Sequence, residues 1–191
     1  MNTITAFDMV RLEKTEIDSM KLTFKMVRES DISELYTITR KTFISSYQDN
    51  NTLENMALQL NTVLSRKQLL REINHPNINF YLVYLNEELV AYFKLNFKDG
   101  QTDFFDDEAM ELERIYVYEQ FQGNGIGKMC LDKCLRIAKS RGCKFIWLGV
   151  WESDKAIIKF YERFGFEKFG EHVYMFGNEQ QNDHLLRLDL K

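Results

Sequence analysis

Between positions 119 and 128 the chain reads Glu-Gln-Phe-Gln-Gly-Asn-Gly-Ile-Gly-Lys. A strand-like run ends just before this stretch, at Val117, and an amphipathic helical pattern begins within it, at about Gly125. The first N–H groups of a helix lack internal partners and lie at the positive end of the helix dipole. Glycines let the backbone approach a phosphate without side chains in the way. The stretch therefore predicts a turn that binds a pyrophosphate through its backbone, with Lys128 as an additional positive charge.

Single residues exclude two familiar glycine-rich motifs. The dinucleotide fingerprint G-x-G-x-x-G requires glycine where this chain has Lys128. A P-loop requires Ser or Thr after the lysine to hold magnesium, and this chain has Met129. The pattern is instead Gln-x-x-Gly-x-Gly over residues 122–127. Taken alone, this string leaves an ordinary glycine-rich turn as the alternative interpretation.

Strand-like and helix-like runs alternate on both sides of the turn. Upstream, strand patterns cover residues 22–27, 79–85, 89–97 and 110–117, and helical patterns cover 31–43 and 53–73. Downstream, a helix over 125–140, a buried strand over 145–150 and a helix over 154–164 precede a terminal strand pair, 169–176 and 184–190. Helices between strands, with a meander in the middle, predict a mixed α/β sheet. We expect one domain over residues 20–191, preceded by a polar extension over 1–19.

Composition excludes several classes of protein. The net charge of −4 and the lack of a basic stripe argue against nucleic-acid binding. No apolar run approaches the ~18 residues that span a bilayer, and the first twenty residues lack the apolar stretch of a signal peptide, so we expect a cytoplasmic protein without membrane contact. Cys130 and Cys134 are four residues apart on one helix face and, with Cys143, lack the spacing of metal ligands. We expect small apolar packing residues and no metal site.

Acidic residues are concentrated just before the last strand upstream of the turn. Residues 99–113 contain seven acids and no base. One interpretation is a solvated loop. The other is an electrostatic funnel that concentrates a cationic substrate. The second interpretation makes Asp106, Asp107 and Glu111 candidate substrate-binding residues.

Two later stretches extend the pattern of the glycine-rich turn. Residues 147–152 read Trp-Leu-Gly-Val-Trp-Glu, and residues 160–166 read Phe-Tyr-Glu-Arg-Phe-Gly-Phe. Together with the turn they resemble the GNAT superfamily of N-acetyltransferases, in which a buried strand and a helix ending Tyr-x-x-x-Gly-Phe follow an Arg/Gln-x-x-Gly-x-Gly/Ala loop. The resemblance covers roughly Leu22 to the C-terminus. It implies a mixed, mostly antiparallel sheet flanked by helices, whose splayed central strands admit acetyl-CoA as the co-substrate.

Two further stretches narrow the resemblance. Residues 112–117, Leu-Glu-Arg-Ile-Tyr-Val, and residues 174–183, Tyr-Met-Phe-Gly-Asn-Glu-Gln-Gln-Asn-Asp, are similar to bacterial spermidine/spermine N-acetyltransferases of the PaiA type. This resemblance implies direct acetyl transfer to a small-molecule amine, a polyamine. A peptide or protein amine, another small amine, and a CoA-binding regulatory protein without turnover remain as alternatives. A homodimer is compatible with the sequence.

The resemblance also implies which residues bind the co-substrate. Asp154 replaces the asparagine that contacts pantetheine in the family, and its carboxylate could still accept a hydrogen bond from an amide N–H. Backbone N–H groups along residues 115–117, in the strand before the glycine-rich turn, would stabilise the oxyanion that forms when the amine attacks the thioester. The full set of co-substrate residues is Ile115, Tyr116, Val117, Gln122, Gly123, Asn124, Gly125, Ile126, Gly127, Lys128 and Asp154.

Proton transfer requires two further groups. An amine with a pKa of about 10.4 is almost entirely protonated at pH 7, so a base is useful. Glu113 matches the glutamate assigned as base, through a water, in similar polyamine acetyltransferases, and Glu111 is the reserve. Their two-residue spacing places both on one strand face unless a bulge intervenes. Tyr161 matches the family tyrosine that donates a proton to the departing thiolate. Tyr47 and Trp151 are further pocket candidates without an assigned role.

Overall fold

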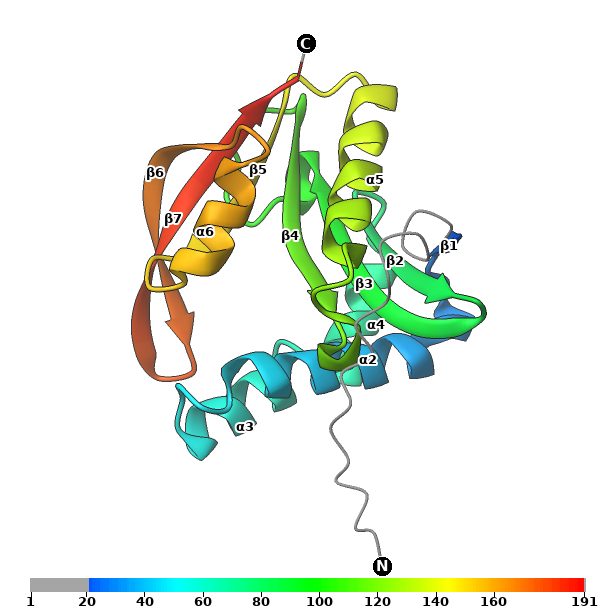
Figure 1. The fold of residues 1–191 in the computed structure, drawn as a ribbon. Coiled ribbons are helices and arrows are strands. Elements are labelled where there is room, and N and C mark those ends of the chain that lie inside the picture. The colour runs from blue at the N-terminus through cyan, green and yellow to red at the C-terminus, as the bar shows by residue number, and fades with distance from the viewer. Residues whose placement is uncertain (1–20, 191) are drawn as a thin grey trace, which may run out of the picture.

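The computed structural model describes residues 21–190, which form one seven-stranded sheet in the order β1-β2-β3-β4-β5-β7-β6 (Figure 1). Every neighbouring pair is antiparallel except β4 and β5, which run parallel. The expected mixed, mostly antiparallel sheet is confirmed. The predicted extension over residues 1–19 lies outside the described residues.

The strands and helices follow the predicted order with small shifts at most ends, but the last strand, predicted over 184–190, already begins at Glu179. The strands are β1 Leu22–Met26, β2 Ile78–Leu85, β3 Glu88–Phe97, β4 Ala109–Val117, β5 Phe145–Trp151, β6 Glu167–Phe176 and β7 Glu179–Asp189. The helices are α2 Ile32–Tyr47, α3 Leu53–Asn61, α4 Arg66–Ile73, α5 Ile126–Ser140 and α6 Lys155–Glu162. Within residues 21–190, no helix is both long and apolar enough to cross a bilayer.

The prediction of one helix over residues 53–73 is wrong, because the chain forms two helices there. The first ends at Asn61, and the second begins after Ser65. The Ser65 hydroxyl accepts a hydrogen bond from the Gln68 amide at 3.1 Å. A serine that caps a helix N-terminus in this way favours a new start over continuation.

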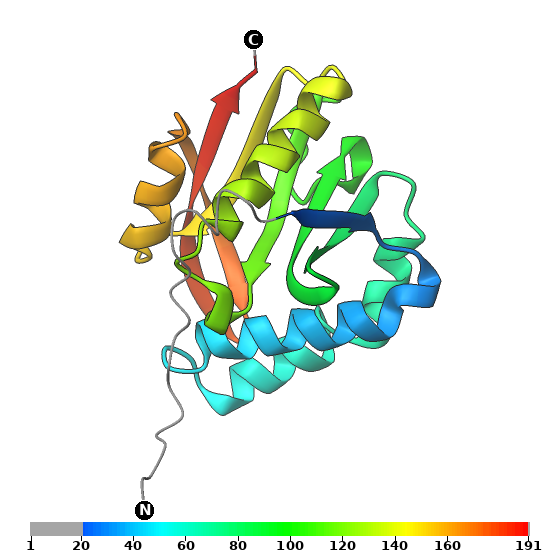
Figure 2. The same ribbon diagram turned by 45° about the vertical axis from the view of Figure 1, so that its right-hand side comes forward.

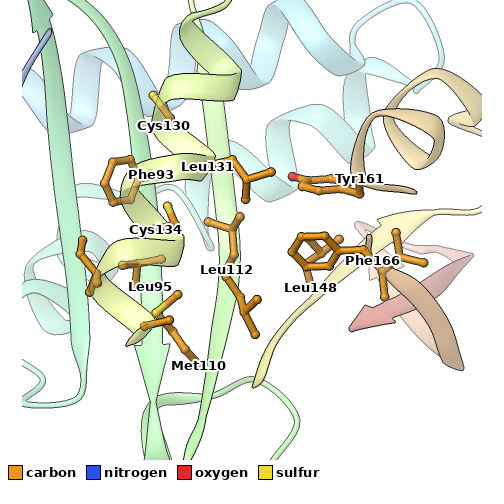
Figure 3. Close-up of a cluster of buried hydrophobic side chains, with 14 of the residues drawn as sticks. Phe93, Leu95, Met110, Leu112, Cys130, Leu131, Cys134, Leu148, Tyr161 and Phe166 are labelled. Carbon is orange, nitrogen blue, oxygen red and sulfur yellow. The ribbon is translucent and has the colours of Figure 1, made fainter. Parts of the chain in front are cut away.

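Two apolar layers cover the sheet. On one face, α5 and α6 pack against β3, β4 and β5 through a core that includes Phe93, Leu112, Leu131 and Leu148 (Figure 3). Cys130 and Cys134 are fully buried in this core, which confirms their predicted packing role. On the other face, α2 and α4 cover β2 and β3. Figure 2 shows α2 and α3 running beneath the sheet.

The two central strands diverge. β4 pairs with β5 only through residues 109–111, which face residues 145–147. Beyond Glu111 the two strands no longer pair, so the expected splay is observed. At the other end of the molecule α3 contacts the turn between β6 and β7, and so links the β1–β4 part of the sheet to the β5–β7 part. Asn55 Oδ1 accepts a hydrogen bond from the backbone amide of Asn178, in that turn, at 2.9 Å. Gln59 Nε2 also donates to the Met175 carbonyl at 3.0 Å.

Candidate active site

A cavity of about 1090 Å³ lies where β4 and β5 diverge. Its walls come from the glycine-rich turn, β4, β5, α6, the β6–β7 hairpin and the helices beneath the sheet. Ten aromatic side chains line it, together with five carboxylates and three cations. The charged residues are Glu72, Glu113, Glu119, Asp154, Asp183, Lys94, Arg114 and Lys128.

The glycine-rich turn has the geometry of an anion site. Gly125 caps α5 with φ of 76°, a left-handed conformation that favours glycine. The first bond to the helix runs from the Met129 amide to the Gly125 carbonyl, so the amides of residues 126–128 precede the helical ladder. A Cβ built on Gly127 would meet nothing within 4 Å. Open space beside three N-terminal amides fits a pyrophosphate group.

Most of the predicted turn residues reach the cavity. Gln122, Gly123, Gly125 and residues 126–128 line it. Lys128 also forms an ion pair with Asp132 at 2.8 Å, which reduces the charge it offers to a ligand. Asn124 is the exception, because its side chain is buried and does not line the cavity. Its amide nitrogen lies 3.4 Å from the carbonyls of Phe121 and Gln122, so it holds the turn in shape.

The edge of β4 that faces the splay offers backbone groups to a ligand. Ile115, Tyr116 and Val117 all line the cavity. β5 pairs with β4 only as far as Glu111, so these residues have no strand partner on that side among residues 21–190. The Tyr116 hydroxyl lies 2.9 Å from the Tyr47 hydroxyl, which places Tyr47 in the cavity wall.

Tyr161 and Asp154 approach the cavity from α6. The Tyr161 side chain is buried, and Figure 3 shows its hydroxyl pointing toward Leu131 of α5. Burial raises the pKa of this hydroxyl, so it is protonated at neutral pH, as a proton donor must be. Asp154 Oδ1 accepts a hydrogen bond from the Ile157 amide at 3.0 Å and caps the helix. Asp154 therefore has a structural role besides its position in the cavity wall.

Glu113 lies at a β-bulge, where the β3–β4 register shifts opposite Lys94 and Leu95. Its carboxylate contacts Lys94 Nζ at 2.5 Å and Arg114 Nη2 at 2.9 Å. Burial opposes ionisation, but the two cations outweigh it and lower the pKa of Glu113 to about 2. An effective base has a pKa near the working pH. Glu113 lines the cavity as predicted, but this environment argues against its predicted role as the base.

Glu111 is placed differently from the prediction. It is 2% exposed and does not line the cavity. Its carboxylate accepts hydrogen bonds from the Thr102 amide at 2.7 Å and from Asn96 Nδ2 at 2.8 Å. Burial and the nearby Glu113 raise its pKa to about 7. Glu111 fixes the loop before β4 to the sheet through Thr102 and Asn96.

The acidic loop also falls outside the cavity wall. Asp106 Oδ1 accepts a hydrogen bond from the Glu108 amide at 2.8 Å. Glu108 pairs with Lys144, and Asp107 is exposed. None of the three lines the cavity. The structure therefore does not support Asp106 and Asp107 as substrate-binding residues, and the solvated-loop interpretation describes them better.

Several cavity residues were not predicted from the sequence. Lys94 on β3 and Asp183 on β7 are charged and line the cavity. Burial raises the pKa of Asp183 to about 6. The hairpin also brings Tyr174 and Phe176 into the wall. Asp183 and Tyr174 belong to the stretch 174–183, which resembles the polyamine acetyltransferases. The sequence does not show which residues of this stretch face the cavity, because that depends on the strand pairing.

Comparison with known proteins identifies the family. The sequence model of the Acetyltransferase (GNAT) family matches residues 32–166. An uncharacterised N-acetyltransferase of Lactobacillus delbrueckii subsp. lactis is 34% identical over 161 residues, which is 84% of this chain and 93% of that protein. The spermine/spermidine N(1)-acetyltransferase of Bacillus subtilis is 38% identical over 61 residues, 31% of this chain and 40% of that protein.

A solved structure shows the same fold. The PaiA N-acetyltransferase of Thermoplasma acidophilum, in complex with coenzyme A, superimposes with a TM-score of 0.72 over 90% of this chain and all of that one, at 19% identity. The family match covers the glycine-rich turn, β4, β5 and α6, which together surround the cavity. The chain therefore belongs to the GNAT family of acetyltransferases, and acetyl-CoA is its co-substrate.

Proposed function

We propose that the chain transfers the acetyl group of acetyl-CoA to a primary amine of a polyamine such as spermidine or spermine. The observation that carries this proposal is the cavity wall, which combines five carboxylates with ten aromatic side chains against three cations. Carboxylates attract ammonium groups, and aromatic faces contact them favourably. The partial match to the Bacillus subtilis spermine/spermidine enzyme supports the same class of acceptor.

The proposed reaction is direct attack by the neutral amine. The amine nitrogen forms a bond to the thioester carbonyl carbon, and backbone N–H groups between Ile115 and Val117 stabilise the resulting oxyanion. The positively charged nitrogen then loses a proton to solvent and the carbon–sulfur bond breaks. Tyr161 donates a proton to the departing thiolate and regains one from solvent. The amides of residues 126–128 bind the pyrophosphate, and the Asp154 carboxylate faces the pantetheine arm.

A steady-state screen tests the acceptor. Purified protein and acetyl-CoA are combined separately with spermidine, spermine, lysine and short peptides with a free α-amine, and thiol release is measured. We expect kcat/KM for spermidine or spermine to exceed that for lysine and the peptides by tenfold or more. A preference for a peptide amine or for lysine would overturn the polyamine proposal and leave the acetyltransferase assignment intact.

A further inference from the structure

Asp183 differs from the other carboxylates in the cavity wall. Glu113 and Glu72 share Lys94 as an ion-pair partner. Glu119 accepts a hydrogen bond from Ser45 Oγ at 2.9 Å, and Asp154 caps α6. Among residues 21–190, no hydrogen bond or ion pair engages the carboxylate of Asp183. A half-buried carboxylate without a partner is costly unless a ligand supplies the missing cation.

The nearest basic group is already engaged. His172 lies directly opposite Asp183 in the β6–β7 pairing. Its Nδ1 pairs with Asp103 Oδ2 at 2.8 Å. The attraction of His172 lowers the pKa of Asp183, and the charge of Glu152, which follows β5, raises it. No basic side chain among residues 21–190 forms an ion pair with Asp183.

The strand pairing aims Asp183 at the splay. On the other flank of β7, Asp183 lies opposite Trp151 of β5. A Cβ built on Gly149 would lie 3.5 Å from Asp183 Oδ2, so the carboxylate occupies space that a side chain at 149 would fill. Leu148, Val150 and Leu186 face the core around Tyr161. Because side chains alternate along a strand, Gly149, Trp151 and Asp183 face the opposite side of the sheet.

Tyr116 faces the same side from across the splay. It packs with Tyr92 in the layer on that face, and the Asp183 charge is close enough to raise its pKa. Trp151 and Tyr116 both line the cavity with Asp183. A carboxylate in one cavity wall with aromatic side chains can bind an ammonium group, through an ion pair and cation–π contacts.

We propose that Asp183 is the residue that binds an ammonium group of the acceptor amine, in a site completed by Trp151 and Tyr116. This inference rests on the proposed transfer to an amine and names the residue that selects a cationic acceptor. The charge that attracts the acceptor is then the Asp183 carboxylate, beside the gap between β4 and β5, and not the acidic loop before β4. The titratable groups that face Asp183 are His172, Glu152, Tyr116 and Tyr174.

Asp183→Asn tests the assignment because it keeps the shape of the side chain and removes its charge. Spermidine is the probe, titrated by calorimetry into protein saturated with CoA, and the acceptor KM is measured in parallel. We expect the Kd and KM for spermidine to rise tenfold or more, with the KM for acetyl-CoA changed less than twofold. Asp189→Asn is the matched control, since it makes the same change at an exposed position on the same strand.

Thermal unfolding separates a binding role from a structural one. Without the unpartnered charge, Asp183→Asn should unfold at a higher temperature than the wild type, although it binds spermidine more weakly. A lower melting temperature, or unchanged spermidine binding, would overturn the proposal.

The failure of the polyamine assignment is a separate outcome. If the wild type acetylates only lysine or a peptide amine, the Asp183 comparison is repeated with that amine, because amines with pKa values of about 10.4 (lysine) and about 8 (a peptide α-amine) are mostly protonated at pH 7. An unchanged KM for the amine that the wild type does use would then overturn the role of Asp183 alone.

Discussion

Glu113 and Arg114 are adjacent in sequence, yet their side chains meet on one face of the sheet, with 2.9 Å between Oε1 and Nη2. Consecutive residues of a regular strand point to opposite faces. The β-bulge in β4 removes this alternation locally and brings both side chains into the cavity wall. Lys94 completes the cluster from β3. The cluster holds two largely buried cations, and both of them contact two carboxylates, those of Glu113 and Glu72.

Glu113→Gln should therefore destabilise the fold. Removing one partner of a buried ion pair costs about 3–5 kcal/mol, and here it leaves two buried cations, Lys94 and Arg114, with Glu72 as their remaining carboxylate within residues 21–190. We expect the free energy of unfolding in urea to fall by about 3 kcal/mol. Glu108→Gln, which breaks the exposed pair with Lys144, should change it very little. A fully stable Glu113→Gln protein with kcat lowered a hundredfold would instead restore the role of Glu113 as base.

The same carboxylate predicts how stability depends on pH. Its pKa is about 2 in the folded protein, below the ordinary value of 4.5. A lowered folded-state pKa contributes stability above pH 4.5, and this stability is lost as the pH falls toward 2. The unfolding free energy of the wild type should decline across this window, and that of Glu113→Gln should decline less. Urea titrations at pH 5, 4 and 3 measure the difference, and parallel curves would contradict the prediction.

Gly127→Val tests the pyrophosphate site without straining the backbone. Gly127 is within α5, and a side chain there would enter open space beside the helix N-terminus. Valine should fill the space that the phosphates occupy and raise the KM for acetyl-CoA tenfold or more, with the fold intact. Gly127→Ala is the control, because the family pattern accepts alanine at this position. Equal KM values for the valine variant and the wild type would place the pyrophosphate elsewhere.

Tyr161→Phe removes a hydroxyl that makes no hydrogen bond with the residues from 21 to 190. The ring should keep its packing against Phe160 and Phe166, so the melting temperature should barely change. Loss of the proton donor should lower kcat by about 10²-fold, with CoA affinity unchanged. Tyr81→Phe is a matched control, since Tyr81 stacks on Phe93 and does not line the cavity. Wild-type turnover in a chemistry-limited assay would make Tyr161 a purely structural residue.

The acidic loop should have little influence on acceptor binding. Asp106, Asp107 and Glu108 do not line the cavity, and Glu108 is paired with Lys144. Changing all three to their amides should leave the KM for spermine within twofold of the wild type at both low and high salt. A strong rise in KM at low salt alone would show that the loop attracts the acceptor at long range, since salt screens solvated charges over about 8 Å at 0.15 M.

Much of the fold could be predicted from local signals. The glycine-rich turn after Val117 and the apolar patterns that follow it predicted α5 and β5 correctly. Such signals can be recognised because helix caps and hydrophobic periodicity depend only on residues that are close in sequence. The break between α3 and α4 was missed, since an apolar pattern ran through it and the Ser65 cap was not weighed. Tyr161 and the predicted turn residues other than Asn124 line one cavity.

The acceptor side of the cavity could not be predicted, because it depends on contacts between distant residues. Glu111 and Glu113 are two residues apart, yet one is buried under Thr102 and the other faces Lys94. This difference arises from the bulge and from β3, neither of which two-residue spacing reveals. The position of Asp183 opposite Trp151 and His172 depends on the register of β7 with β5 and β6.

The short pairing of β4 with β5 makes the sheet two ribbons that are fastened at one end. Three residue pairs join them there, and the contacts of α3 with the β6–β7 turn bridge them at the other end. A ligand in the splay would act as an extra strand between the ribbons and supply the partners that each edge lacks. Co-substrate binding should then slow amide hydrogen exchange along residues 112–117 and at the α3 bridge together. The bound acyl donor would then join the two ribbons along the stretch between these two connections.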